Sequence, residues 1–166
     1  MTAPAVLRSV PVALGIPALG VAVPLSSLGL NSDGTVEVPT DYQEPGWFRL
    51  GPTPGQIGSS VILGHVDSYQ GPAVFFKLGT LRPGDRVDVL LADGVVVHFA
   101  VDGVATYLKS QFPADQVYGS NGSSALELVT CGGQFDQRSG HYLSNIVVAT
   151  SLVGSTSPAK VPPTPR

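Results

Sequence analysis

The chain has 166 residues, of which 43% are hydrophobic and only 13% are charged, with 9 Lys+Arg against 12 Asp+Glu and a formal net charge of -3. This composition can build one hydrophobic core, which excludes a globally disordered chain, and it lacks the basic footprint of a nucleic-acid-binding protein. The 20 Gly and 15 Pro residues disfavour long helices. We therefore expect one all-β domain of short strands joined by turns.

The first apolar stretch runs from Ser9 to Ser32 without a charged residue, a length that would allow a membrane span. Proline and glycine residues recur throughout it, and in lipid they would leave backbone groups without hydrogen-bond partners. The stretch is better interpreted as short buried strands at 11–16 and 20–25. The start of the chain shows no basic segment followed by an apolar one, so a signal peptide is not predicted.

Further strands are predicted where apolar residues alternate or are β-branched, at 35–38, 59–63, 85–91, 95–101, 104–107, 125–129 and 145–152. Asp-Gly pairs at 33–34, 93–94 and 102–103 mark tight reversals of the chain, and the middle pair is the clearest hairpin. Only 73–78 and 113–117 carry a helical signal. A set of about eight such strands is typical of a closed barrel or a sandwich.

The two ends of the chain are expected to lie outside the folded domain, which we place at 9–153. Residues 1–8 are predicted to be loose, and residues 154–166 to form a disordered Pro-rich tail. The tail cannot enter the interior of a sheet because it contains Pro158, Pro162, Pro163 and Pro165.

The single cysteine, Cys131, follows the predicted strand at 125–129 and precedes Gly132 and Gly133. It cannot close an intramolecular disulfide, and one cysteine with three scattered histidines provides no four-ligand metal site. A thiol at the end of a strand suits a nucleophile, because the glycines let a substrate approach and can direct N–H groups at an oxyanion. The alternative is a buried thiol that behaves as a small hydrophobic residue.

The three histidines differ in their surroundings. His65 follows an apolar run at 61–63, where an imidazole can act as the acid and base that a cysteine nucleophile needs, or can pack without a role. His98 is expected on one face of a strand as a cross-strand partner, and His141 in a surface loop.

One arginine stands close to the cysteine in sequence. Arg138 comes seven residues after Cys131, and a loop that folds back would place its guanidinium beside the thiol. A cation there lowers the pKa of a thiol or stabilises an oxyanion. The alternative is a solvated loop charge.

Two motifs together resemble the signature of the sortases: LGHVDS at 63–68 and LVTCGG at 128–133, with the His and the Cys 66 residues apart. Segments at 16–21, 34–39, 46–48, 71–75, 81–85 and 112–113 extend the resemblance over about residues 8–152. They resemble the actinobacterial classes E and F, and class F more than class E. The resemblance implies an eight-stranded β-barrel with a groove lined by the Cys, the His and an Arg.

Sortases are membrane-anchored extracellular transpeptidases. They cut a Leu-Pro-X-Thr-Gly sorting signal of surface proteins between Thr and Gly, through a thioester on the cysteine, and pass the acyl group to an amine of a cell-wall precursor. The resemblance therefore implies a protein on the extracellular face of the membrane, anchored by an N-terminal segment absent from this chain. It also implies a reaction that needs no metal or organic cofactor.

By the same resemblance, Cys131 matches the family nucleophile and His65 the family acid and base. In many sortases the catalytic arginine lies on the strand that follows the cysteine, where this chain reads YLSN at 142–145 and has no arginine. Arg138 is the only arginine between Cys131 and the tail, so it is assigned the role of oxyanion stabiliser and substrate orienter.

Two alternatives remain open at this point. An enzyme of the L,D-transpeptidase type also joins His and Cys on a β fold, but it usually keeps them close together in a Ser-x-Gly-Cys context. A non-catalytic β-barrel or immunoglobulin-like binding module would instead bury Cys131. Alkylation separates these classes, since a buried core thiol resists it and a groove nucleophile does not.

Overall fold

The computed structural model describes residues 6–120 and 122–158 and contains a nine-stranded sheet in the order β2-β1-β8-β9-β11-β10-β5-β4-β3. Its strands are β1 (Pro11–Ile16), β2 (Val21–Pro24), β3 (Ser26–Leu28), β4 (Gly46–Phe48), β5 (Gly58–Leu63), β8 (Arg86–Leu91), β9 (Val96–Leu108), β10 (Ser124–Asp136) and β11 (His141–Thr156). A separate hairpin comprises β6 (Asp67–Ser68) and β7 (Gly71–Pro72). The helical segments are η1 (Pro17–Leu19), η2 (Leu78–Thr80), η3 (Lys109–Gln111) and α1 (Ala114–Tyr118).

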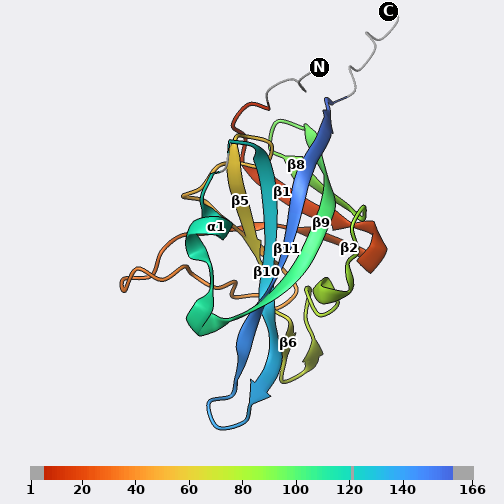
Figure 1. Cartoon of the computed structure of the whole chain (residues 1–166). Coiled ribbons are helices and arrows are strands. Elements are labelled where there is room, and N and C mark those ends of the chain that lie inside the picture. The colour runs from red at the N-terminus through yellow and green to blue at the C-terminus, as the bar shows by residue number, and fades with distance from the viewer. Residues whose placement is uncertain (1–5, 121, 159–166) are drawn as a thin grey trace, which may run out of the picture.

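The sheet curls into a nearly closed barrel because its two edge strands are consecutive in the chain (Figure 1). Only Leu25 separates β2 from β3. Its N–H donates to Val12 in β1, whereas the N–H of Ser26 donates to Pro45 beside β4. The expected all-β barrel is therefore confirmed, and it has eight strands, the expected number, when β2 and β3 are counted as one bent strand.

Side chains alternate between two apolar clusters along the central strands, as the period of a strand requires. Leu126 and Leu128 of β10 point into the barrel, where they are fully buried in the main core. Val129 belongs to a smaller cluster on the outer face, together with Val117 of α1. Cys131 lies two residues after Val129, so the outer face of β10 also carries the thiol.

Most predicted strands are confirmed, at 11–16, 20–25, 59–63, 85–91, 125–129 and 145–152. The hairpin at 93–94 is also confirmed, with Gly94 at φ +89° and the N–H of Val95 donating to Asp93. The reversal predicted at Asp102-Gly103 is wrong, because 96–101 and 104–107 belong to the single strand β9. Asp102 is an extra residue opposite the Ala149–Thr150 step of β11, so the pair forms a β-bulge.

The strand predicted at 35–38 is also wrong. Val36 makes only an isolated bridge to Leu30, and the carboxylate of Glu37 accepts the N–H of Gly29 at 2.8 Å. Of the two helical signals, 113–117 corresponds to α1, whereas 73–77 forms turns and η2 begins at Leu78. The short strands β3, β4, β6 and β7 were not predicted, because two or three residues show no periodicity.

The folded domain extends beyond the predicted limits of 9–153. Val6 packs against the core, and Arg8 Nη1 donates to the carbonyl of Gly51 at 3.2 Å. Gly154 to Thr156 continue β11 and pair with β9. The rest of the two predicted loose ends, apart from Leu7, Ser157 and Pro158, lies outside the described residues.

The uncharged stretch from Ser9 to Ser32 forms β1, η1, β2 and β3. In the part of the chain that the structure describes, no helix has the length and apolarity needed to cross a membrane.

A half-buried carboxyl on the outer face of β10 makes stability depend on pH. Burial and, to a lesser extent, the nearby charge of Asp102 together raise the pKa of Glu127 from its usual 4.5 to about 7. Because the folded state keeps a proton that the unfolded state loses, stability falls as the pH rises from 4.5 to 7 and then levels off.

We expect Glu127→Gln to stabilise the protein at pH 8, and to change its stability little at pH 3.5, where both states of the wild type are largely protonated. The shift corresponds to roughly 3 kcal/mol, which solvent around the half-exposed side chain reduces to about 1–2 kcal/mol. Urea denaturation of both proteins at the two pH values measures the difference. Equal free energies of unfolding at pH 8 would contradict the assignment.

Candidate active site

Two parallel strands bring Cys131 and His65 together although they lie 66 residues apart in the chain. β5 pairs in parallel with β10, and the last pair in register is Leu63 with Val129. Just beyond this last pair each chain segment carries its reactive residue, with His65 two positions after Leu63 and Cys131 two positions after Val129. The parallel pairing therefore places the imidazole and the thiol beside one another, as the two sequence motifs predict.

The residues immediately before the reactive pair are tied directly to each other. The hydroxyl of Thr130 donates to the carbonyl of Gly64 at 2.7 Å, in a fully buried position, and the N–H of Gly64 donates to Val129 at 3.1 Å. Gly64 is also packed closely, because an added Cβ would lie 2.6 Å from the ring of Phe75. These contacts fix the separation of the backbones that carry Cys131 and His65.

The strand that carries Cys131 does not end there. β10 continues to Asp136, paired with β11, so the backbone is free of a strand neighbour only on the side where β5 has ended. An extra residue between Gly132 and Phe135 makes a bulge. Gly133 lies there at φ +74°, and an added Cβ would lie 2.9 Å from Cβ of Ser144, so only glycine fits.

His65 is oriented by the loop that precedes β4. Its Nε2 lies 2.7 Å from the carbonyl oxygen of Pro39. A carbonyl can only accept, so Nε2 carries the proton and Nδ1 is the basic nitrogen of the neutral ring. The ring of Tyr42 packs against the imidazole with centroids 4.5 Å apart. The histidine therefore has a defined tautomer and a defined orientation.

Cys131 and His65 open into one cleft with a volume of about 820 Å³. Tyr42 and the β6–β7 hairpin form one side, and the β10–β11 hairpin, which projects beyond the barrel in Figure 1, forms the other. Much of the exposed surface is aromatic, with Tyr69 at 91% exposure and Phe135 at 48%. The complete lining consists of Tyr42, His65, Val66, Asp67, Ser68, Tyr69, Lys109, Cys131, Phe135, Gly140, His141 and Tyr142.

A hydrogen bond joins the two sides of the cleft. Tyr142 Oη donates to Asp67 Oδ2 at 2.5 Å. This bond to Asp67 raises the pKa of Tyr142, and burial and the charges of Asp67 and Cys131 add to the effect. The phenol therefore stays protonated and keeps the β11 side of the cleft attached to the β6–β7 hairpin.

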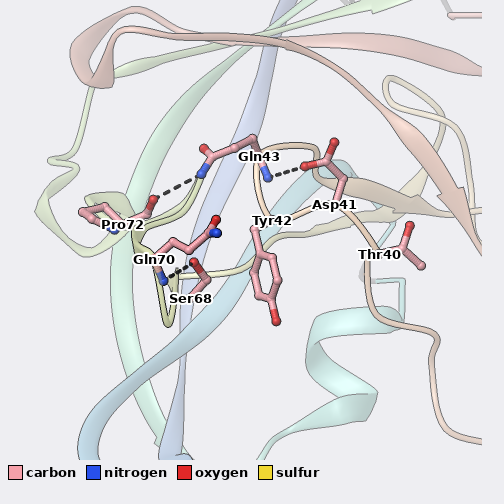
Figure 2. A pocket seen from close by; sticks show the side chains of 7 residues that line it. All are labelled: Thr40, Asp41, Tyr42, Gln43, Ser68, Gln70 and Pro72. Carbon is pink, nitrogen blue, oxygen red and sulfur yellow. Dashed lines mark hydrogen bonds between the residues drawn. The ribbon is translucent and has the colours of Figure 1, made fainter.

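A second, polar hollow of about 600 Å³ adjoins the cleft and shares Tyr42 and Ser68 with it. Figure 2 shows Gln43, whose Nε2 donates to the carbonyl of Pro72 at 3.2 Å and ties the loop that holds Tyr42 to the β6–β7 hairpin. The other lining residues are Thr40, Asp41 and Gln70.

The structure places the remaining predicted residues as follows. Arg138 lies exposed in the turn between β10 and β11, where its N–H donates to Asp136, and it does not line the cleft. His98 is a cross-strand partner, as predicted, with Nδ1 2.6 Å from Asp88 Oδ1. His141 is not in a loop as predicted; it is the exposed first residue of β11 and lines the cleft.

Sequence reasoning missed Tyr42, Lys109 and Tyr142 as cleft residues, because none of them stands in a pattern that marks a site, and it gave no role to Asp67 although Asp67 belongs to the motif at 63–68. Within residues 6–120 and 122–158, no three His, Cys, Asp or Glu side chains are grouped closely enough to hold a metal ion.

The bond between Thr130 and Gly64 allows a specific test. Thr130→Val should lower the free energy of unfolding by about 1–3 kcal/mol, because it leaves a buried carbonyl without a partner. It should also lower kcat/KM in the proposed reaction roughly 10-fold, because the strand ends that carry Cys131 and His65 are no longer tied.

Thr150→Val is a matched control for this experiment. Thr150 is equally buried and donates to Leu126 at 2.9 Å, but it lies away from the strand ends that carry the reactive pair. It should lose similar stability and keep its activity. If both variants lost activity equally, the bond at Thr130 would have no special role in positioning.

Comparison with known proteins agrees with this geometry. One similar solved structure is sortase A from Corynebacterium diphtheriae, with a TM-score of 0.65 and 15% identity over 96% of this chain and 65% of that chain. A second is sortase A from Listeria monocytogenes, with a TM-score of 0.69 and 14% identity over 93% of both chains. A third is the SrtA sortase from Actinomyces oris, with a TM-score of 0.66 and 20% identity over 93% of this chain and 86% of that chain. At these identities the likeness shows the fold.

The sequence itself establishes the family. No curated protein matches the chain, but the family model for the sortase domain matches residues 14–153. The match includes both reactive positions and leaves the L,D-transpeptidase and binding-module alternatives without support. Because this match covers most of the 166 residues, the chain belongs to the sortase family of cysteine transpeptidases.

Proposed function

We propose that this sortase cleaves a Leu-Pro-X-Thr-Gly sorting signal between Thr and Gly and transfers the acyl part to an amine of a cell-wall precursor. The observation that supports this reaction most strongly is the shared cleft just beyond the last paired residues of β5 and β10, where Cys131 and His65 lie together. A thiol beside an oriented imidazole is the arrangement that nucleophilic acyl transfer needs.

In the first half of the proposed reaction, the thiol of Cys131 passes its proton to Nδ1 of His65, and the resulting thiolate attacks the carbonyl carbon of Thr. A C–S bond forms and the carbonyl oxygen becomes an oxyanion, which backbone N–H groups near Gly132 and a cation stabilise. The oxyanion then collapses, the C–N bond to Gly breaks, and His65 protonates the leaving amine. Because Pro39 holds the proton on Nε2, we assign this transfer to Nδ1.

In the second half, an incoming amine attacks the thioester. His65 takes a proton from the amine, a new amide bond forms and the thiolate of Cys131 leaves. The side chains of this chain thus supply a nucleophile and one group that alternates between acid and base.

The surface of the cleft is compatible with the proposed signal. Leu and Pro are apolar, and Tyr69, Phe135 and Tyr142 offer aromatic contact area on both sides of the thiol. We propose surface proteins with this signal as the donor substrates and the extracellular face of the membrane as the place of action. Within the family, the motifs resemble actinobacterial class F most closely.

Product analysis tests the proposed specificity. The protein is incubated with a Leu-Pro-X-Thr-Gly peptide, with and without a glycyl amine, and the fragments are identified by mass spectrometry. We expect cleavage only between Thr and Gly, and a Thr-amide product when the amine is present. Cleavage at another bond, or equal cleavage of a control peptide with Thr and Gly exchanged, would overturn this specificity.

A further inference from the structure

The proposed acyl transfer creates negative charge first on the sulfur of Cys131 and then on the carbonyl oxygen of the substrate. We propose that the ammonium group of Lys109 is the cation that stabilises both charges. This inference rests on the proposed function, and it assigns to Lys109 the electrostatic role for which the sequence suggested Arg138.

The register of three adjacent strands places Lys109 on the correct face of the sheet. Cys131 of β10 pairs with Asn145 of β11, and Asn145 pairs with Tyr107 of β9, so these side chains share a face. Lys109 comes two residues after Tyr107, and the extended backbone of Leu108 (φ -57°, ψ 139°) keeps the alternation of side chains. The side chain of Lys109 therefore leaves the backbone on the face that carries the thiol, and Lys109 lines the same cleft.

Lys109 is also the only cation lining that cleft among the residues that the structure describes. Arg8 donates to Gly51, and Arg86 pairs with Asp88 at 3.4 Å, both outside the cleft. Arg138 lies in the exposed turn of the β10–β11 hairpin.

The charge of Lys109 is not neutralised by a neighbour. Within the described part of the chain, its side chain makes no hydrogen bond or ion pair. A lysine ammonium is a compact charge on a flexible stem, so it can approach an oxyanion as the oxyanion forms.

The other ionisable groups of the cleft make a cation necessary. Asp67 is the acidic residue of the lining, and Tyr142 is held protonated through its bond to Asp67. The remaining titratable groups are Tyr42, His65, Tyr69 and His141. A thiolate at Cys131 therefore shares the cleft with the carboxylate of Asp67, whose negative charge disfavours it, and the ammonium of Lys109 opposes this effect.

Two matched substitutions test the proposal. Lys109→Met and Arg138→Met each remove one cation and keep an unbranched side chain, and Lys109→Arg restores a charge. The first measurement is the rate of Cys131 alkylation by neutral iodoacetamide between pH 5 and pH 10, which reports the pKa of the thiol without any substrate. The second is the rate of acylation by the signal peptide.

We expect Lys109→Met to move the midpoint of the alkylation profile up by about one pH unit and to slow acylation roughly 10- to 100-fold. Lys109→Arg should keep a midpoint near that of the wild type and most of the acylation rate. Arg138→Met should change neither the midpoint nor the acylation rate. An unchanged profile in Lys109→Met, or a larger effect in Arg138→Met, would overturn the proposal. Failure of the wild type to react with the peptide would instead count against the proposed function, and the alkylation profile would still decide the role of Lys109.

Discussion

Replacement of Cys131 by Ala is expected to abolish both peptide cleavage and amine transfer, a loss of at least about 10⁴-fold in kcat/KM. The reason is chemical: without the sulfur no thioester forms, and no other cysteine exists in the chain. The measurement is the rate of product formation with the Leu-Pro-X-Thr-Gly peptide.

Loss of folding must be separated from loss of the nucleophile in this variant. Cys131 is only half-buried, so its truncation should change the free energy of unfolding by no more than about 1 kcal/mol. Circular dichroism and a denaturation curve should therefore match those of the wild type. Turnover by a folded Cys131→Ala variant would show that another group performs the acyl transfer.

Replacement of His65 by Gln is expected to reduce kcat/KM by about 10²- to 10⁴-fold. The Gln amide can still donate to the carbonyl of Pro39, so the loop keeps its attachment. It can neither protonate the leaving amine nor take a proton from the acceptor, so the cleavage and transfer steps should both be slow. Single-turnover kinetics with and without added amine measure the two steps separately.

His98→Gln serves as the control for this experiment. His98 is also on a strand and is hydrogen-bonded, to Asp88 and to Thr156, but it does not line the cleft. The substitution should leave the kinetics unchanged. Equal losses in the two variants would mean that the fall in rate comes from general disturbance of the fold and not from removal of an acid and base.

The reactive pair was predictable because each of its residues comes two positions after a strand run rich in apolar side chains. Val61 and Ile62 of one run are buried, as are Leu126, Leu128 and Val129 of the other, although Glu127 is only half-buried. The sequence therefore indicated the positions of His65 and Cys131 relative to the two core strands, and the sortase motifs indicated that the two strands are neighbours.

A local turn signal in the sequence led to a wrong prediction where it falls inside a long, paired strand. Asp-Gly favours a tight turn, yet Asp102-Gly103 forms a bulge because β9 pairs with β11 on both sides of it, and that pairing outweighs the preference for a turn. The opposite happens at 35–38. Its alternating residues suggest a strand, but it pairs with residues 29–31 through only one isolated bridge, and Glu37 uses its side chain to accept the N–H of Gly29.

The rest of the cleft depends on contacts between distant segments, which a single sequence does not encode locally. Tyr42 reaches His65 from a long loop, and Lys109 reaches the cleft from the end of β9. Arg138, in contrast, is close to Cys131 in sequence but does not line the cleft. Seven residues from Cys131 is a short distance in sequence, but an extended strand covers about 3.3 Å per residue, so the hairpin carries Arg138 away from the thiol. Its predicted role is tested against Lys109 by the matched Met variants.

The central claim is that Cys131 forms a transferable acyl intermediate in the cleft that it shares with His65. Intact-protein mass spectrometry after mixing with the signal peptide tests this most directly, followed by digestion to locate the adduct. We predict a mass increase equal to the Leu-Pro-X-Thr acyl group, located on Cys131 and lost when an amine is added. An adduct on another residue, or a wild-type protein that cleaves the peptide without ever carrying the acyl group on Cys131, would contradict the claim.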